Sequence, residues 1–188
     1  MRNGAKTKEL IAQTALRLFV AKGITETTIR DIAGAAGLAE GTLYRHYDSK
    51  ESLAWELFAV NYIAFARELD RLQEDQPTLK AKLAAMVGRF CVFFDEDPVL
   101  FSYLLLAQHA QLKKVTPEMP NPVEVVRSVI AGGIARGEAP PADAEVAAAM
   151  VMGVVLQVAV FKIYGRIPRS LAGLAEYLTE ACWRVLNL

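Results

Sequence analysis

The spacing of apolar residues constrains the fold of this chain more than any other feature. Between the glycine and proline breaks, apolar residues recur at intervals of three and four in almost every segment, and the alternation typical of strands is scarce. Of 188 residues, 53% are hydrophobic and 22% are charged, which favours a folded protein with a substantial core. The sequence therefore predicts an all-α protein.

Caps and breaks divide the chain into about nine expected helices. Asp48 and Glu51 have the spacing of a capping box for the fourth helix, and Ser170 is the expected cap of the last. Gly37 follows the second helix, where a left-handed turn is expected. Either Thr27 or Thr28 is the expected cap of the second helix. The helices are expected at about residues 6–22, 28–36, 40–46, 49–73, 78–94, 97–112, 121–136, 142–164 and 170–185.

Charge is unevenly distributed along the chain. The formal net charge is zero, which excludes a uniformly basic nucleic-acid binder. Residues 1–50 nevertheless hold eight Lys/Arg against five Asp/Glu, whereas the remaining residues hold 13 against 16. This polarity favours a site for a polyanion near the N-terminus.

Location and cofactors follow from three absences in the sequence. The first nine residues are polar and basic and lack the form of a secretory signal, so a cytoplasmic location is expected. The longest apolar run, residues 146–161, is too short to span a bilayer and predicts a buried core or interface helix and no membrane partner. Cys91 and Cys182 have no metal-ligand spacing, so no disulfide, metal or cofactor is expected.

The most specific segment lies between residues 27 and 53. Two short helices joined by a turn at Gly37, behind a longer helix, have the form of a helix-turn-helix. The segment reads TTIRDIA (27–33), AGL (36–38), GTLYRHY (41–47) and SKESL (49–53). It closely resembles the DNA-binding domain of the TetR/AcrR family, the tetracycline-repressor-like regulators, over about residues 6–58.

The resemblance implies both the domain organisation and a DNA-binding site. Residues 1–48 would form a three-helix DNA-binding domain, and residues 49–188 a helical regulatory and dimerisation domain whose last two helices form the dimer interface. The third helix would enter the major groove. The expected DNA-binding residues are Thr28, Ala39, Glu40, Gly41, Thr42, Tyr44, His46, Tyr47 and Lys50.

Several of these positions have a structural alternative. Ala39 and Glu40 depart from the hydroxyl or basic residues of many relatives. Glu40 either accepts from a cytosine amino group or complements the helix dipole as a first-turn carboxylate. Tyr44 either contacts DNA or packs, and His46 either contacts DNA or caps its helix.

The regulatory half offers apolar residues for an effector pocket, with ordinary core packing as the alternative. Gln157, in the middle of an apolar helix, needs a polar partner in the pocket or across the dimer. The expected ligand-binding residues are Phe90, Phe94, Phe101, Tyr103, His109, Met150, Gln157 and Phe161. Small residues at 144–153 and the leucines of the last helix, including Leu174 and Leu178, predict a four-helix dimer interface.

The function indicated is a ligand-responsive transcriptional regulator. It would be a repressor that binds a palindromic double-stranded DNA operator as a homodimer and is released by a small hydrophobic effector. An enzyme is not expected, because no nucleophile elbow, phosphate-binding glycine loop or HExxH motif is present. A helical small-molecule or lipid carrier without specific DNA binding remains the alternative, and it leaves the N-terminal motif unexplained.

Overall fold

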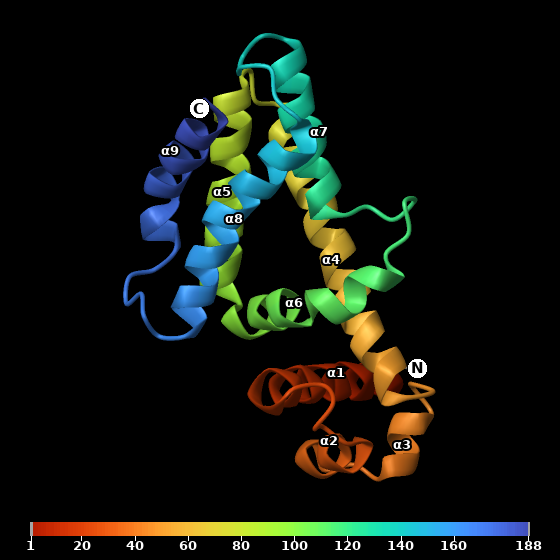
Figure 1. Ribbon diagram of the computed structural model, residues 1–188. Coiled ribbons are helices and arrows are strands. Elements are labelled where there is room, and N and C mark those ends of the chain that lie inside the picture. The colour runs from red at the N-terminus through yellow and green to blue at the C-terminus, as the bar shows by residue number, and fades with distance from the viewer. Residues whose placement is uncertain (1, 188) are drawn as a thin grey trace. The chain divides into compact units, whose positions relative to one another are not determined.

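The computed structural model describes residues 2–187, except for the side chains of residues 2, 3, 109 and 110. Over this range the chain forms nine α-helices, two short 3₁₀ helices and no strand, which confirms the predicted all-α class (Figure 1). The helices are α1 (Arg2–Lys22), α2 (Ile29–Ala36), α3 (Glu40–Tyr44), α4 (Lys50–Glu74), α5 (Leu79–Glu96), α6 (Pro98–Gln111), η1 (Leu112–Lys114), α7 (Pro122–Ala135), α8 (Ala144–Ile163), η2 (Ala172–Leu174) and α9 (Ala175–Leu186).

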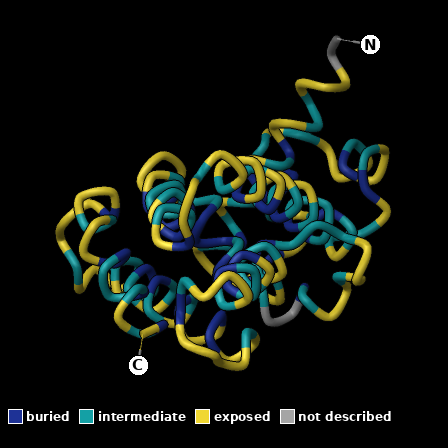
Figure 2. The backbone as a smooth tube through the Cα atoms, turned by 90° about the horizontal axis from the view of Figure 1, so that it is seen from above, coloured by how far each residue is buried: buried dark blue, intermediate teal, exposed yellow. Residues whose placement is uncertain are grey.

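Contacts divide the chain into two compact units. The first, called the head below, comprises Met1–Asn61 and Val99–Val115; it holds α1, α2, α3, the start of α4, most of α6 and η1. The second, called the body, comprises Tyr62–Pro98 and Thr116–Leu188. Along the helices of both units, buried and exposed residues alternate (Figure 2). The functional division predicted at residue 48 stays a prediction.

The turn between α2 and α3 has the geometry that its sequence predicts. Thr28 caps α2 in a capping box, because its hydroxyl accepts from the backbone of Asp31 while the Asp31 carboxylate accepts from the backbone of Thr28. Gly37 ends α2 with φ of 67°, in the left-handed region where a side chain would be strained. The N–H of Leu38 then donates to the carbonyl of Ala33 over 2.9 Å, which fixes the direction of the chain into α3.

The start of α4 differs from the prediction by one residue. The N–H of Ser52 donates to the Ser49 hydroxyl over 3.0 Å, and the N–H of Ser49 donates to the Ser52 hydroxyl over 3.0 Å. The reciprocal cap is therefore Ser49 with Ser52, and the expected pair of Asp48 and Glu51 was wrong. In this capping box the N3 residue, Ser52, supplies a hydroxyl at the place where the common sequence pattern has a carboxylate.

In the body, α5 packs on α9 and η2, and α7 packs on α8. The carboxylate of Asp95 on α5 accepts from the backbone N–H groups of Leu171 and Ala172, at 3.1 and 2.8 Å. These bonds satisfy amides at the start of η2 that have no partner within the helix. They also join the segment before α9 to α5.

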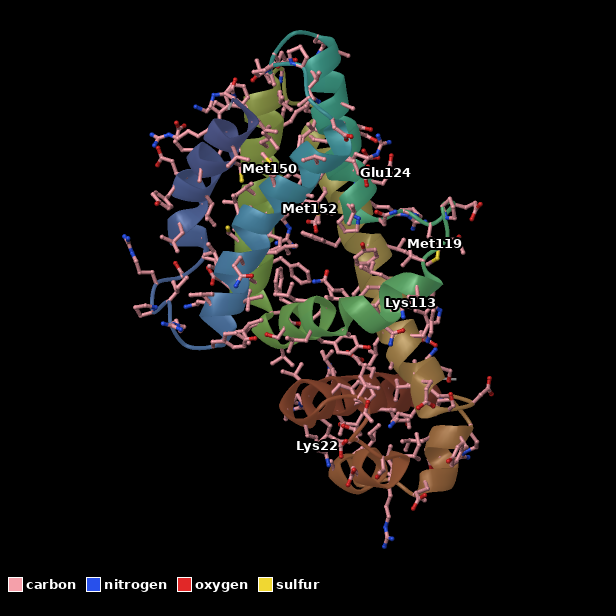
Figure 3. All side chains as sticks on the ribbon, viewed as in Figure 1. Lys22, Lys113, Met119, Glu124, Met150 and Met152 are labelled. Atoms are coloured by element: carbon pink, nitrogen blue, oxygen red, sulfur yellow. The ribbon has the colours of Figure 1, made fainter. Side chains whose placement is uncertain are left out.

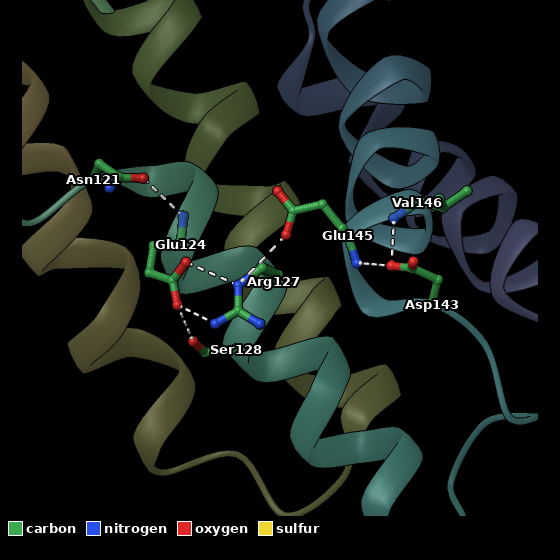
Figure 4. Close-up of polar contacts among 7 residues, drawn as sticks. All are labelled: Asn121, Glu124, Arg127, Ser128, Asp143, Glu145 and Val146. Atoms are coloured by element: carbon green, nitrogen blue, oxygen red, sulfur yellow. Dashed lines mark hydrogen bonds and ion pairs between the residues drawn. The ribbon is translucent and has the colours of Figure 1, made fainter. Parts of the chain in front are cut away.

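Polar contacts join α7 to α8 at their starts (Figure 4). Asn121 caps α7 by accepting from the N–H of Glu124 over 2.8 Å, and Asp143 caps α8. Arg127 on α7 pairs with Glu124 on its own helix and lies 3.7 Å from the carboxylate of Glu145 on α8. The pairing raises the pKa of Arg127 and lowers that of Glu124.

The last helix is shorter than predicted. The Ser170 hydroxyl accepts from the N–H of Gly173 in η2 over 3.1 Å. The last helix, α9, begins only at Ala175 and has no side-chain cap, so the cap expected at Ser170 was wrong. Leu171 and Leu178 are buried inside the body. The prediction that the leucines of this helix supply a stripe for a dimer partner was therefore wrong for Leu178, because this side chain fills the core of its own chain.

Candidate nucleic-acid interface

The side chains of α3 lie almost entirely on the surface of the head. Leu43 is fully buried and anchors the helix, whereas Glu40 and Gly41 are exposed and Tyr44 keeps 55% of its surface accessible. The N-cap residue Ala39 is exposed and makes no side-chain cap. A helix held by a single apolar residue presents its remaining side chains to a partner, as a major-groove helix must.

Thr28 lies beside this helix at the start of α2, and its capping box carries a perturbed carboxylate. The pKa of Asp31 is lowered to about 2, first by the hydrogen bond from the Thr28 backbone and then by Lys22 and the Thr28 hydroxyl. Lys22 extends from the end of α1 toward α2 (Figure 3), and its ammonium lies 3.0 Å from the Asp31 carboxylate. Asp31 therefore stays ionised, and its contacts join the end of α1 to the start of α2.

Lys50 and Tyr47 have structural contacts that the sequence did not reveal. The Lys50 ammonium donates to the carbonyl of Thr25 over 3.0 Å, which ties the start of α4 to the turn after α1. Tyr47 is only 5% exposed, and the Lys8 ammonium lies 5.3 Å from its ring centre. Burial raises the pKa of Tyr47 to about 12. Its ring is part of the head core, so its burial gives no support to the DNA contact predicted for Tyr47.

A hollow of about 330 Å³ lies next to α3, lined by residues from the first two turns of α1, from α3 and from the two positions after α3. Its lining includes Thr42 and His46, two of the predicted DNA-binding residues, together with Gly4, Thr7 and Arg45. Arg45 was not among the predicted residues. The signal for it was present, because it is a cation inside the segment that carries the motif.

The residues predicted to bind a ligand are divided between the body and the head, and those of the body lie on two helices. Phe94 is buried and Phe90 half-buried, both on α5. Met150, Gln157 and Phe161 instead lie on an exposed face of α8. This face, called the α8 stripe below, consists of Val146, Ala149, Met150, Gly153, Gln157, Phe161 and Tyr164.

Two further predicted ligand residues belong to the head. Tyr103 on α6 is buried, its ring stacks on Phe19 with 5.9 Å between ring centres, and its hydroxyl donates to the carbonyl of Ala54 over 2.6 Å. Burial raises its pKa. Its ring and hydroxyl are thus already engaged within the head, and the ligand-binding role of Tyr103 stays a prediction. Phe101 is also buried in the head, and the side chain of His109 lies outside those described.

Gln111 is a candidate that the sequence did not distinguish. It ends α6, is 5% exposed, and its side-chain oxygen Oε1 is buried without a hydrogen-bond partner. An unsatisfied buried amide costs about 1 to 3 kcal/mol, so it is a position where a ligand that donates a hydrogen bond gains affinity. A polar residue at the end of an apolar helix gives no sequence signal for such burial.

The cysteines are free thiols, and burial raises the pKa of both Cys91 and Cys182 to about 11. Among the described residues no group of three or more His, Cys, Asp or Glu side chains could hold a metal ion.

Known proteins resemble the chain most clearly in the head. Residues 11–57 match the family described as bacterial regulatory proteins, tetR family. The putative mycofactocin biosynthesis transcriptional regulator MftR of Mycobacterium tuberculosis is 32% identical over 98 residues, which are 52% of this chain and 49% of that protein. The HTH-type transcriptional repressor KstR2 of Rhodococcus jostii is 46% identical over 56 residues, 30% of this chain and 26% of that protein. The chain thus matches half or less of the length of these relatives.

Solved structures are similar over nearly the whole chain. The fatty acid degradation regulator FadR from Bacillus halodurans has a TM-score of 0.81 and 19% identity, and the match covers 93% of each chain. The transcriptional regulator FadR from Bacillus subtilis, solved in complex with stearoyl-CoA, has a TM-score of 0.74 and 20% identity over 93% of this chain and 96% of that one. Residues 11–57 thus form a DNA-binding domain of the tetR family of bacterial regulatory proteins, and the chain as a whole has the fold of these solved transcriptional regulators.

Proposed function

We propose that this protein is a ligand-responsive transcriptional regulator, a repressor that binds an inverted-repeat operator as a homodimer and is released by a small hydrophobic effector. The observation that carries the proposal is α3, a helix of the head that buries only Leu43 and leaves the side chains of Glu40 and Tyr44 exposed. The expected DNA-contacting residues are Thr28, Ala39, Glu40, Gly41, Thr42, Tyr44, His46 and Lys50. The protein would act in the cytoplasm, where bacterial DNA lies, and would not be an enzyme.

Selection of bound sequences from random double-stranded DNA tests this function. The purified protein should enrich an inverted repeat, because two heads related by a two-fold axis read two identical half-sites. Tyr44→Ala should weaken binding to that repeat and leave the fold intact, since the Tyr44 side chain is exposed. Enrichment of no sequence would contradict a specific regulator and favour the helical carrier.

The α8 stripe is the proposed centre of the homodimer. α8 is long and apolar enough to cross a membrane by length and composition alone, which corrects the prediction that the apolar run at residues 146–161 is too short. An 18-residue window of α8 has a mean hydropathy of 2.2, and only 28% of that window is buried within the chain. An apolar face this large needs a cover. A second copy fits, because Ala149 and Gly153 are small enough for the two copies of α8 to approach closely and Gln157 could pair with its symmetry mate.

A matched pair of variants tests the interface by sedimentation. Met150, labelled in Figure 3, is 40% exposed on α8, and Leu72 on α4 is 39% exposed. Met150→Glu should give monomers, because it would place two carboxylates in an apolar interface, whereas Leu72→Glu should stay dimeric. A dimeric Met150→Glu variant would move the interface elsewhere. Leu178→Asp is unsuitable, since Leu178 is in the core of its own chain.

The proposed effector is a molecule with an apolar chain and a polar group that donates a hydrogen bond. Two observations support this class: the similar fold of a regulator solved with stearoyl-CoA, and the unsatisfied oxygen of Gln111 at the end of α6. Stearoyl-CoA, stearic acid and coenzyme A, each added to the protein bound to its selected DNA, test the class. Release by either acyl compound but not by coenzyme A supports it, and release by none contradicts a fatty acyl effector.

A further inference from the structure

The hollow beside α3 is lined by residues from two segments that are distant in the sequence. Gly4 and Thr7 belong to α1, which supports the head, and Thr42, Arg45 and His46 come from the end of α3 and just beyond it. A side chain added at Gly4 would meet no atom within 4 Å, so the backbone of α1 is accessible there. The lining thus offers hydroxyl, imidazole and guanidinium groups to one ligand.

Arg45 is the charged group of this hollow, and it is held in place. One of its guanidinium nitrogens, Nη2, donates to the Thr42 hydroxyl over 3.1 Å. This bond uses one of the five N–H donors of the side chain. Across the described side chains Arg45 has no carboxylate within ion-pair distance, whereas Lys8 pairs with Glu56 and Lys22 with Asp31.

We propose that the hollow binds one backbone phosphate of the operator in each half-site, with Arg45 as its charged donor and Thr42 as the residue that positions Arg45. This inference rests on the proposed DNA-binding function and deepens it. A phosphodiester is recognised by guanidinium and hydroxyl groups, and side chains with both groups line this hollow. Arg45 therefore fixes the position of the head on the DNA and does not read a base.

The position of Arg45 favours phosphate over a base edge. Major-groove helices contact bases mainly through their N-terminal residues, and Arg45 follows the last residue of α3, Tyr44. Its bond to Thr42 turns the guanidinium back along the helix surface, to the side where α1 completes the hollow. Base reading would instead fall to the exposed residues at the start of α3, Glu40 and Gly41.

The salt dependence of DNA binding tests the proposal. A dimer would lose two phosphate contacts in Arg45→Ala, so the slope of log affinity against log salt should become shallower by about 1.8, from about 0.9 per contact. Affinity should fall roughly tenfold or more for operator and random DNA alike. The sequence recovered by selection from random DNA should be the same for Arg45→Ala and the wild type.

Two further sets of variants make the test specific. Arg17→Ala removes the same charge from α1, where the Arg17 guanidinium donates to the carbonyl of Gln13, and should leave the slope unchanged. Thr42→Val should weaken binding, Thr42→Ser should restore it, and the effects of Thr42→Val and Arg45→Ala should not add. Additive effects would overturn the positioning role of Thr42.

The outcomes separate this inference from the proposed function. If Arg45→Ala changes the selected base at one position and keeps the slope, Arg45 reads a base and the inference is wrong. If Arg45→Ala binds every sequence like the wild type, the hollow takes no phosphate, although the protein remains a DNA-binding regulator. If the wild type binds no DNA, the proposed function fails and this inference fails with it.

Discussion

The hydroxyl of Tyr103 donates a 2.6 Å hydrogen bond to the carbonyl of Ala54, and this bond joins α6 to the start of α4 inside the head. The Tyr103 ring also stacks on Phe19 of α1. A segment more than forty residues beyond the DNA-binding motif is thus part of the unit that carries the motif. A ligand that moves α6 would directly disturb the packing of α6 on α1 and α4, because Tyr103 of α6 contacts the Phe19 ring of α1 and the Ala54 carbonyl of α4.

Tyr103→Phe keeps the ring and removes the hydroxyl, so it isolates this hydrogen bond. The free energy of unfolding should fall by about 1 kcal/mol, the usual net value of one such bond. Urea titration measures the change. Tyr177→Phe is the matched control, because the Tyr177 side chain on α9 is exposed and its hydroxyl should contribute almost nothing. Equal losses of unfolding free energy in the two variants would show that the Tyr103 hydrogen bond stabilises the fold no more than an exposed tyrosine hydroxyl does.

Ser49→Ala tests the cap of α4. The variant loses the hydroxyl that accepts from the Ser52 N–H and should destabilise the protein by about 1 kcal/mol. Asp48→Ala should lower the free energy of unfolding by less than about 0.5 kcal/mol, because Asp48 is not the cap and interacts only with the helix dipole. Thermal unfolding of both variants compares them. A larger loss in Asp48→Ala would restore Asp48 as the capping residue.

Acid should weaken the contact between α1 and α2 through Asp31. The pKa of this carboxyl in the folded protein, about 2, is below its ordinary value of 3.8. Ionised Asp31 therefore stabilises the fold above about pH 4, and the contribution is lost as the pH falls through about 2. Unfolding by urea at pH 5 and pH 2.5 should show a smaller pH effect in Asp31→Asn than in the wild type. An equal effect in both would contradict the assigned contacts.

Gly153→Leu separates the proposed dimer from the fold of one chain. A side chain at this position meets nothing within 4 Å in the described chain, and replacing glycine inside a helix favours the helix by about 0.5 to 1 kcal/mol. The folded chain should therefore be as stable or slightly more stable, while the dimer dissociates, because the leucine keeps the two copies of α8 apart. Sedimentation against concentration gives the dimer constant. An unchanged constant would remove Gly153 from the interface.

Gln111→Leu tests the unsatisfied amide of α6. Without effector the variant should be more stable than the wild type by up to about 1 to 3 kcal/mol, since a buried oxygen without a partner is removed. Release of DNA by the effector should require a higher concentration. Gln157→Leu on α8 is the control, because the Gln157 side chain is exposed in the single chain. A loss of stability in Gln111→Leu would mean that the amide already has a partner in solution.

Local sequence determined most of the fold and the place of the DNA-binding surface. Thr28 caps the start of α2, Gly37 ends it, and Leu43 anchors α3. These features are local, because capping, left-handed turns and apolar spacing act between residues a few positions apart. The family resemblance rested on this same segment. The exposure of Tyr44 follows from its place on a helix that one leucine holds.

Tertiary structure decided the roles of residues whose partners are distant in the chain. Tyr103 and Tyr47 are aromatic and polar like ligand or DNA contacts, and only their packing on Phe19 and beside Lys8 places them in the head core. Leu178 has the spacing of an interface residue, yet α5 and α8 already pack against its helix. Sequence periodicity says which face of a helix is apolar, but the neighbour that covers the face is selected by long-range packing.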